Sequence, residues 1–213
     1  MKNLFRILMM LGVVGFMASC STAPEGEKVD AKDAKDVKVE AEAKTLAVDV
    51  AASKVEWVGT KTGGQHNGEV MLKSGSLNVK GEEIVGGSFV LDMNSIVALD
   101  LEGKAKGDLE GHLKTGDFFE VEKFPEAKFE ITAVKAEAGE GGATHKIEGN
   151  LTLKDVTKSV TIPAIVKMEN GAVSASTPQF TIDRQVWGIN YKSTMKDVIL
   201  NDQIGLKITL SAK

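Results

Sequence analysis

The stretch Ile204-Gly205-Leu206-Lys207-Ile208-Thr209-Leu210-Ser211, near the end of the chain, alternates apolar residues with small or polar ones. A period of two places alternate side chains on opposite faces of a β-strand, so one face is buried and the other meets water. The same alternation recurs earlier in the chain, at residues 55–59, 89–93, 129–133, 147–153 and 160–166. We therefore expect strands to outnumber helices by a wide margin.

Turn signals rich in glycine separate these stretches, at Gly63-Gly64, Lys80-Gly81, Gly86-Gly87, residues 139–142 and Asn170-Gly171. Their spacing suits hairpins and meanders, which pair strands antiparallel. About eight strands with one apolar face each predict an all-β fold that closes into an antiparallel barrel, because closure removes the edges that invite aggregation. A two-sheet sandwich would produce almost the same pattern and is the alternative.

Residues 45–213 are expected to form one domain, because 169 residues can bury about 70% of the unfolded surface and no second boundary is visible. One segment, residues 103–122, breaks the period of two. It spaces Leu109, Leu113 and Phe118 among lysines and glutamates, which favours a short helix and loop. We expect this insertion to cap one end of the barrel.

The first 19 residues have the pattern of a bacterial lipoprotein signal peptide. Lys2 and Arg6 precede an uncharged apolar run of 12 residues that ends at Ala18, too short to span a bilayer, which needs about 20. Met17-Ala18-Ser19-Cys20 then resembles the site at which a lipoprotein is cut before its cysteine. Cys20 is therefore predicted to be acylated and to anchor the chain in a membrane. An ordinary secretory leader is the alternative.

Residues 20–44 are predicted to be the acylated cysteine followed by a flexible tether. Residues 21–44 contain 12 charged residues in 24 and no aromatic residue, so they carry too little apolar surface to offset the entropy of ordering. A flexible chain of this length spans roughly 25 to 30 Å. A transient helix over residues 31–44 is the alternative, because alanine, lysine and glutamate favour helices.

The composition excludes several function classes. The chain has 26 basic and 30 acidic residues, and cleavage before Cys20 would leave a formal charge of −6, so no basic face for nucleic acid is expected. One cysteine excludes an internal disulfide or a cysteine-rich metal site. The three histidines, His66, His112 and His145, lack the spacing of a metal site, and we predict none.

Three stretches resemble the YceI-like, polyisoprenoid-binding family of lipocalin-like barrels. They are LEGHLKTGDFFEVEKFPEAKF at residues 109–129, GNLTLKDVTKSVTIP at residues 149–163, and Asp183-Arg184 with Trp187-Gly188. The opening residues 57–61 and His66-Asn67-Gly68 look like the branch of that family found as lipoproteins. The resemblance implies an elongated barrel that holds an isoprenoid chain or another amphiphile, such as a quinone or a polyprenyl lipid.

The candidate ligand-binding residues follow from this resemblance and from the alternation. Those expected to line the interior are Trp57, Phe89, Leu91, Phe129, Ile131, Leu151 and Leu153. Of the adjacent Phe118 and Phe119, one is expected to face the ligand path and the other to pack in the wall. Arg184 could hold an anionic head group, stacked with Trp187 at a rim. Ordinary core packing, and an ion pair or loop contact for Arg184, are the alternative interpretations.

The leading hypothesis is a lipid-anchored binding protein for an isoprenoid-like ligand, and not an enzyme. Its expected place is the bacterial cell envelope, at the outer membrane because Ser21 follows Cys20. Homodimers are compatible with this type of barrel. One alternative is a structural barrel with a filled interior. Another is an enzyme using Asp108, His112 or Arg184, although the usual catalytic motifs are missing from the sequence.

Overall fold

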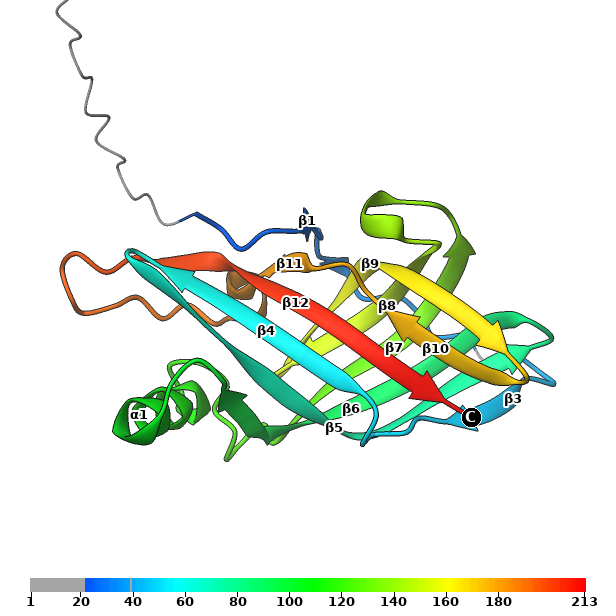
Figure 1. The fold of residues 1–213 in the computed structure, drawn as a ribbon, viewed down its shortest axis with the longest axis horizontal. Helices are drawn as coiled ribbons and strands as arrows, with labels where there is room; N and C mark the ends of the chain where they lie inside the picture. The colour runs from blue at the N-terminus through cyan, green and yellow to red at the C-terminus, as the bar shows by residue number, and fades with distance from the viewer. Residues whose placement is uncertain (1–21, 39) are drawn as a thin grey trace, which may run out of the picture.

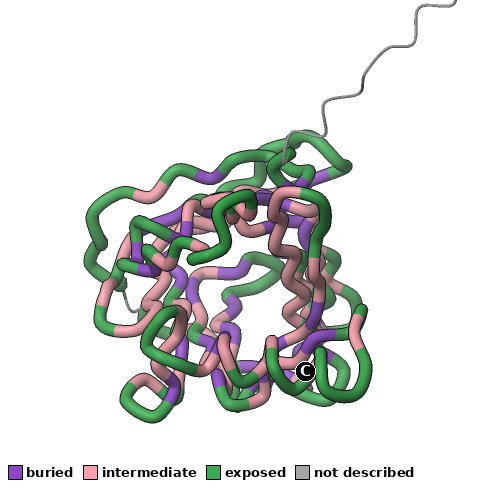
Figure 2. Tube along the Cα trace, turned by 90° about the vertical axis from the view of Figure 1, so that its left-hand side faces the viewer, coloured by how far each residue is buried: buried purple, intermediate pink, exposed green. Residues whose placement is uncertain are grey.

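A computed structural model describes residues 22–38 and 40–213, and most of them form a closed antiparallel barrel (Figure 1). Each strand of the ring pairs with the next along the chain, and β12 returns to pair with β4. The eight ring strands are β4 (Lys54–Lys61), β5 (Gly64–Lys80), β6 (Glu83–Ala98), β7 (Glu126–Ala136), β8 (His145–Leu153), β9 (Val156–Glu169), β10 (Ala172–Ser176) and β12 (Leu200–Ala212). Figure 2 shows the ring end-on. The predicted barrel is therefore confirmed, and the sandwich is excluded.

Two positions in the ring are each completed by an additional short strand. β3 (Lys44–Ala47) continues the line of β4 along β5, and β11 (Phe180–Asp183) continues the line of β10 along β12. The second break contains Pro178, which has no N–H to donate to a ladder. At the first break, the Asp49 carboxylate accepts hydrogen bonds from the backbone of Ala51 and Ala52.

The predicted glycine turns lie between strands, with the exception of Gly86-Gly87. Gly63, Gly81 and Gly171 have positive φ angles of 80°, 62° and 76° and lie between strands. The turn predicted at Gly86-Gly87 is wrong, because both residues lie inside β6. A Cβ on Gly87 would lie 2.6 Å from the carbonyl oxygen of Ser76 on β5. The close approach of the two strands, and not a turn, requires glycine there.

The insertion forms the helix α1 (Gly103–Lys114) and a series of turns, as the sequence predicts. The helix lies at one end of the barrel, on the left in Figure 1. The side chain of Glu110 accepts a hydrogen bond from the backbone N–H of Ala98 at 2.9 Å, which joins the helix to the end of β6. Two short 3-10 helices, η1 (Glu140–Gly142) and η2 (Arg184–Trp187), complete the helical segments of the described residues.

The charged N-terminal segment differs from the predicted tether. Its strand β1 (Glu27–Lys28) pairs parallel with β11, and β2 (Lys32–Asp33) pairs antiparallel with β9. Between them Val29 is buried and packs with apolar residues of β9 and β11. The segment therefore closes the seam between these two strands. Backbone groups at the edges of β9 and β11 order this segment. Amino-acid composition does not reveal such partners.

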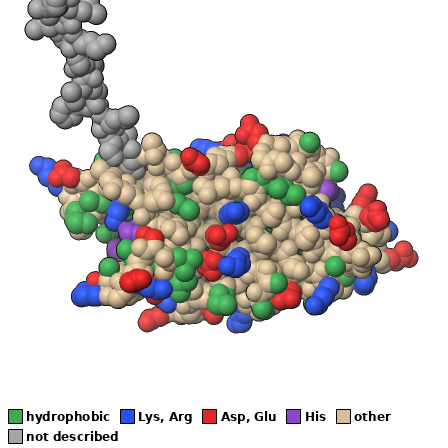
Figure 3. All heavy atoms as spheres, viewed as in Figure 1, with side chains coloured by type: hydrophobic (Ala, Val, Ile, Leu, Met, Phe, Trp, Pro, Cys, Tyr) green, Lys and Arg blue, Asp and Glu red, His purple; other side chains and the backbone are tan. Residues whose placement is uncertain are grey.

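The predictions for the first 20 residues concern a part of the chain that the structure does not describe. The predicted signal peptide at residues 1–19 and Cys20 lie outside the described residues. Among the described residues, no helix has the length and apolar character needed to cross a bilayer. On the face seen in Figure 3, positive and negative side chains are interspersed. Ion pairs also join strands of the ring, such as Lys54 of β4 with Glu69 of β5 and Lys73 of β5 with Glu126 of β7.

Candidate ligand-binding cavity

The barrel encloses a cavity of about 290 Å³. This lies near the lower end of the range for small-molecule sites, about 300 to 1,000 Å³. Ile204, Leu206, Ile208 and Leu210 all line it, whereas the residues between them on β12 do not. These four side chains are only half-buried although they point inward, because they face the cavity instead of packed neighbours. The alternation of β12 thus defines one wall of the cavity.

Most of the predicted ligand-binding residues lie on the cavity wall. Those that line it are Trp57, Phe89, Leu91, Phe118, Phe119, Phe129, Ile131, Leu151, Leu153 and Arg184. They come from β4, β6, β7, β8, η2 and the turns after α1. Apart from Arg184 and the indole nitrogen of Trp57, this set is apolar. Its role in binding stays a prediction.

Phe118 and Phe119 both line the cavity, which corrects the expectation that only one of them would. Adjacent residues point to opposite faces only in a strand, and these two lie in the turns that follow α1. The Phe118 ring also makes an edge contact with His112, with 5.0 Å between ring centroids. Tyr191, in the loop between η2 and β12, lies 5.1 Å from Phe118 and 4.8 Å from His112. These contacts join α1 to that loop beside the cavity.

Trp187 does not line the cavity, which corrects its predicted place at a ligand rim. It is 1% exposed and packs within the wall against residues that include Phe180 and Ile182. Its indole N–H donates to the carbonyl oxygen of Leu151 at 3.0 Å. The indole is therefore part of the barrel wall, with its one donor already satisfied.

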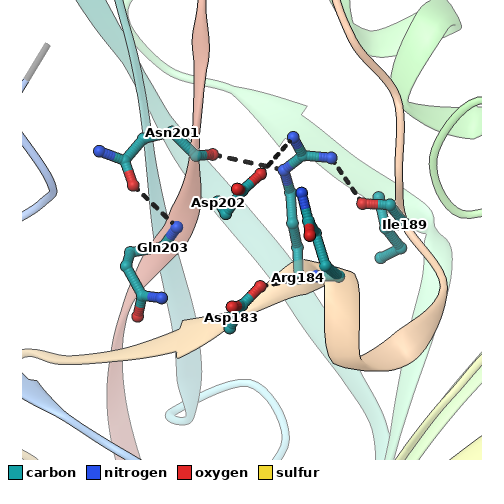
Figure 4. Close-up of polar contacts among 7 residues, drawn as sticks. Asp183, Arg184, Ile189, Asn201, Asp202 and Gln203 are labelled. Atoms are coloured by element: carbon teal, nitrogen blue, oxygen red, sulfur yellow. Dashed lines mark hydrogen bonds and ion pairs between the residues drawn. The ribbon is translucent and has the colours of Figure 1, made fainter.

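Arg184 lines the cavity but is engaged by the protein itself (Figure 4). Its guanidinium donates to the backbone carbonyls of Ile189 and Asn201 and pairs with the Asp202 carboxylate at 2.8 Å. The residue is 4% exposed. A buried guanidinium needs such partners, because an unpaired buried charge is costly. The carboxylate of Asp183 accepts instead from the backbone of Gln185. The interpretation of Arg184 as a loop-holding residue is thus the one its contacts favour.

A second polar group lies where β4 turns into β5, and it contains His66, one of the three histidines considered from the sequence. Lys61 and His66 both line the cavity. Lys61 Nζ is 3.0 Å from His66 Nε2, and His66 Nδ1 is 2.8 Å from Asp100 Oδ2. An ammonium can only donate hydrogen bonds, so His66 Nε2 is the acceptor from Lys61. His66 Nδ1 therefore carries the ring proton and donates a hydrogen bond to the Asp100 carboxylate. The spacing of Lys61 and His66 about the Gly63-Gly64 turn was the available sequence signal.

The environment of Asp100 keeps its carboxylate ionised. Partial burial alone would raise the pKa of Asp100, but hydrogen bonds from His66 and from the backbone N–H of Asn67 outweigh it and hold the pKa below its ordinary value. Lys61, His66 and Asp100 therefore form a hydrogen-bonded row of an ammonium, a neutral imidazole and a carboxylate. In the part of the chain that the structure describes, no group of three or more metal-binding side chains is found.

Comparisons with known proteins agree with this geometry. A family model described as the YceI-like domain matches residues 46–212. A UPF0312 protein of Pseudomonas aeruginosa is 55% identical over 53 residues, and Protein YceI of Salmonella arizonae is 49% identical over 53 residues. Each match spans about a quarter of this chain and about a quarter of the relative.

Two solved structures share the fold over most of the chain. Burkholderia cenocepacia BcnA has a TM-score of 0.62 at 20% identity, covering 78% of this chain and 99% of that protein. A polyisoprenoid binding domain from Saccharophagus degradans, implicated in plant cell wall breakdown, has a TM-score of 0.59 at 14% identity. That match covers 79% of this chain and 97% of the domain. At these identities the likeness concerns the fold.

Proposed function

Because this chain belongs to the YceI-like family, we propose that it binds one isoprenoid-like lipophilic molecule inside its barrel. The observation that carries the proposal is the cavity of about 290 Å³ enclosed by apolar side chains from around the ring. Burial of each methylene group in such a cavity contributes about 0.8 kcal/mol, so an alkyl or prenyl tail can bind without directed hydrogen bonds. The polyisoprenoid binding domain from Saccharophagus degradans, a structural neighbour, supports this ligand class.

A binding role, and not catalysis, suits the groups that were the candidate catalytic residues. Asp108 lies on the exposed side of α1 and pairs with Lys104. His112 contacts the carboxylate of Asp117, and Arg184 is held by Asp202 and by backbone carbonyls. Each is engaged by a different part of the protein. We therefore propose a carrier or sequestering protein.

We further propose that the protein is a lipoprotein of the bacterial cell envelope, anchored through Cys20. Pro24 is buried, and a Cβ on Gly205 would lie 3.0 Å from the Pro24 side chain, so the chain already follows the barrel wall at this residue. An extended chain spans at most about 3.6 Å per residue, which limits the distance from Cys20 to Pro24 to roughly 14 Å. The anchored barrel would then lie against the membrane. The Ser21 that follows Cys20 favours the outer membrane.

The test is native mass spectrometry and organic extraction of the full-length chain purified from a bacterial envelope. The proposal expects one quinone or polyprenyl molecule per chain and a mass increase from acyl groups at Cys20. A protein that is empty and also refuses added isoprenoids would overturn the binding role in favour of a structural barrel. A Cys20 without acyl groups would overturn the anchor alone. The same spectra report whether the chain forms dimers.

A further inference from the structure

Large apolar side chains are exposed at the end of the barrel that carries α1. Ile199 and Met195, in the loop between η2 and β12, are 69% and 64% exposed, the highest values for a large apolar side chain among the described residues. Leu99, which follows β6 at the same end, is 54% exposed. Figure 1 shows the loop extending past the strands beside the β4–β5 turn. Scattered exposed apolar residues are ordinary, but three large ones at one end indicate a contact surface.

Hydrogen bonds place Ile199 beside the cavity wall. Its carbonyl oxygen accepts from the Thr62 backbone N–H at 2.9 Å, and its own N–H donates to the Thr62 hydroxyl at 3.2 Å. The next residue, Leu200, is opposite Lys61, the last residue of β4, and both of these residues line the cavity. Ile199 therefore lies one residue beyond the cavity wall.

The opposite end of the barrel is filled by packed side chains. Leu46 of β3, Val79 of β5 and Ala212 of β12 are 1%, 6% and 1% exposed and belong to one buried apolar cluster. None of these three residues lines the cavity. The cavity therefore approaches the surface at the end that carries Met195 and Ile199.

Resting on the proposed binding of a lipophilic ligand, we propose that this end of the barrel is a membrane-docking tip, through which the ligand passes between the bilayer and the cavity. The tip consists of Leu99, Met195 and Ile199 with the exposed lysines Lys192 and Lys196. The three apolar side chains enter the interface of the bilayer, and the two lysines contact anionic head groups. A ligand tail that crosses here moves between two apolar environments with little exposure to water.

The size and charge of the tip favour a bilayer over a protein partner. Three exposed side chains offer on the order of a few hundred Å² of apolar surface, less than the about 800 Å² per partner that a stable protein interface buries. Residues 190–199 contain two lysines and one aspartate, so the loop carries a net positive charge. Such a charge is attracted to the anionic lipids of a membrane surface.

The N-terminal segment holds the same end near the membrane. A Cβ on Gly205 of β12 would lie 3.0 Å from the Pro24 side chain, so Pro24 lies beside Gly205. Gly205 is six residues from Ile199, roughly 20 Å along an extended chain. The described chain begins in the half of the barrel that carries the loop (Figure 1). Because Cys20 is within roughly 14 Å of Pro24, an anchor at Cys20 keeps the tip within reach of the bilayer.

The first test measures insertion of the tip. The full-length protein is reconstituted in vesicles of phosphatidylethanolamine and phosphatidylglycerol, and Met195→Cys carries a fluorophore. A lipid with a quencher near its head group should quench this fluorophore at least about threefold more than one on Met71→Cys. Met71 is the matched control, because it is 62% exposed but lies on the side of the barrel, within β5. Equal quenching at the two residues would overturn the tip, and no quenching at residue 195 would assign it to a protein partner.

The second test measures transfer of a dansyl-labelled farnesyl probe from the same vesicles to the protein, by energy transfer from tryptophan. Met195→Asp combined with Ile199→Asp should slow this transfer about tenfold or more, because carboxylates replace the inserting side chains. Equilibrium affinity for the probe in solution should change by less than about twofold, because neither residue lines the cavity. Met71→Asp is the matched control and should leave the transfer rate unchanged.

A second pair of variants keeps the proposal testable if the double aspartate variant fails to fold. Lys192→Glu combined with Lys196→Glu should slow transfer from vesicles that contain phosphatidylglycerol but not from vesicles of phosphatidylcholine alone. Unchanged transfer in the folded tip variants would overturn the docking tip, while probe binding in solution would leave the proposed function intact. If the wild type binds no probe in solution, the proposed function itself fails, and the quenching experiment still decides whether the tip enters the bilayer.

Discussion

The side-chain amide of Asn150 brackets the backbone of Lys35, although 115 residues separate them. Asn150 Oδ1 accepts from the Lys35 backbone N–H at 3.0 Å, and Asn150 Nδ2 donates to the Lys35 carbonyl oxygen at 2.7 Å. Asn150 is 6% exposed and lies on β8. Its amide thus forms the two bonds that a neighbouring strand would form, which secures the N-terminal segment after β2. The charged segment is in this way part of the barrel wall.

Asn150→Ala should release the N-terminal segment. The loss of two partly buried hydrogen bonds should lower the free energy of unfolding by about 1 to 3 kcal/mol. Hydrogen exchange at the Val29 and Lys35 amides should accelerate more than exchange at the core of the barrel. Lys158→Met is the control, because its partner Asp33 is fully exposed and such pairs contribute less than about 1 kcal/mol. Unchanged exchange at both amides in Asn150→Ala would contradict the bracketing role.

Ala175→Phe should fill part of the cavity. Ala175 lines the cavity from β10, whereas the neighbouring Ser174 does not line it and is exposed. Phenylalanine at residue 175 would occupy space that a tail needs, so affinity for a farnesyl hydrocarbon should fall about tenfold or more, the loss of roughly two methylene contacts. Ser174→Phe adds the same ring on the outer face and should leave binding unchanged. Calorimetry on both variants decides, and equal affinities would place the ligand elsewhere.

Gly149→Ala and Gly107→Ala should change stability in opposite directions. A Cβ on Gly149 would lie 2.4 Å from the Phe129 ring and 2.7 Å from the Glu130 carbonyl oxygen, so the variant should lose about 1 to 3 kcal/mol. Gly107 lies in α1, where an added Cβ would have no neighbouring atom within 4 Å, and alanine there should add about 0.5 to 1 kcal/mol. Urea unfolding measures both. A stabilising Gly149→Ala would show that both the Phe129 ring and the β7 backbone at Glu130 move to make room.

Asp100 should contribute to stability in a pH-dependent way. Hydrogen bonds from His66 and Asn67 place its pKa in the folded protein below the ordinary value. A lowered folded-state pKa means that the ionised carboxylate stabilises the fold above about pH 4, and that this contribution is lost as the pH falls through the folded pKa. Asp100→Asn should therefore lower the urea midpoint more at pH 7 than at pH 2. Asp197→Asn, in an exposed part of the loop before β12, is the control. An equal effect at both pH values would refute the linkage.

Sequence patterns predicted the barrel because their cause is local. In β12, alternation from Ile204 to Leu210 assigns the inner face, and in α1 the spacing of Leu109 and Leu113 assigns the face toward the barrel. Turn residues such as Asn170-Gly171 adopt positive φ angles with little regard to distant neighbours. The aromatic residues expected inside the barrel lie on the cavity wall for the same reason.

Apart from the orientation of Phe118 and Phe119, the errors concern partners on other strands or loops. Gly86-Gly87 predicts a turn, but glycine is required at residue 87 because the backbone of β5 lies close to it. Arg184 and Trp187 share one short 3-10 helix, but the first is paired with Asp202 and the second is buried in the wall. The Lys61, His66 and Asp100 row forms only because β4, β5 and the end of β6 meet at one end of the barrel.

By itself, then, the sequence determined which residues face inward, where most hairpins turn and which segment becomes helical, since hydrophobic periodicity and backbone preferences act over a few residues. The tertiary structure alone decided that the interior keeps a cavity, because its volume depends on how side chains from eight strands meet. It also decided that a charged, weakly apolar segment would be ordered. The unpaired edges of β9 and β11 and the amide of Asn150 offer that segment hydrogen bonds only after the barrel has closed.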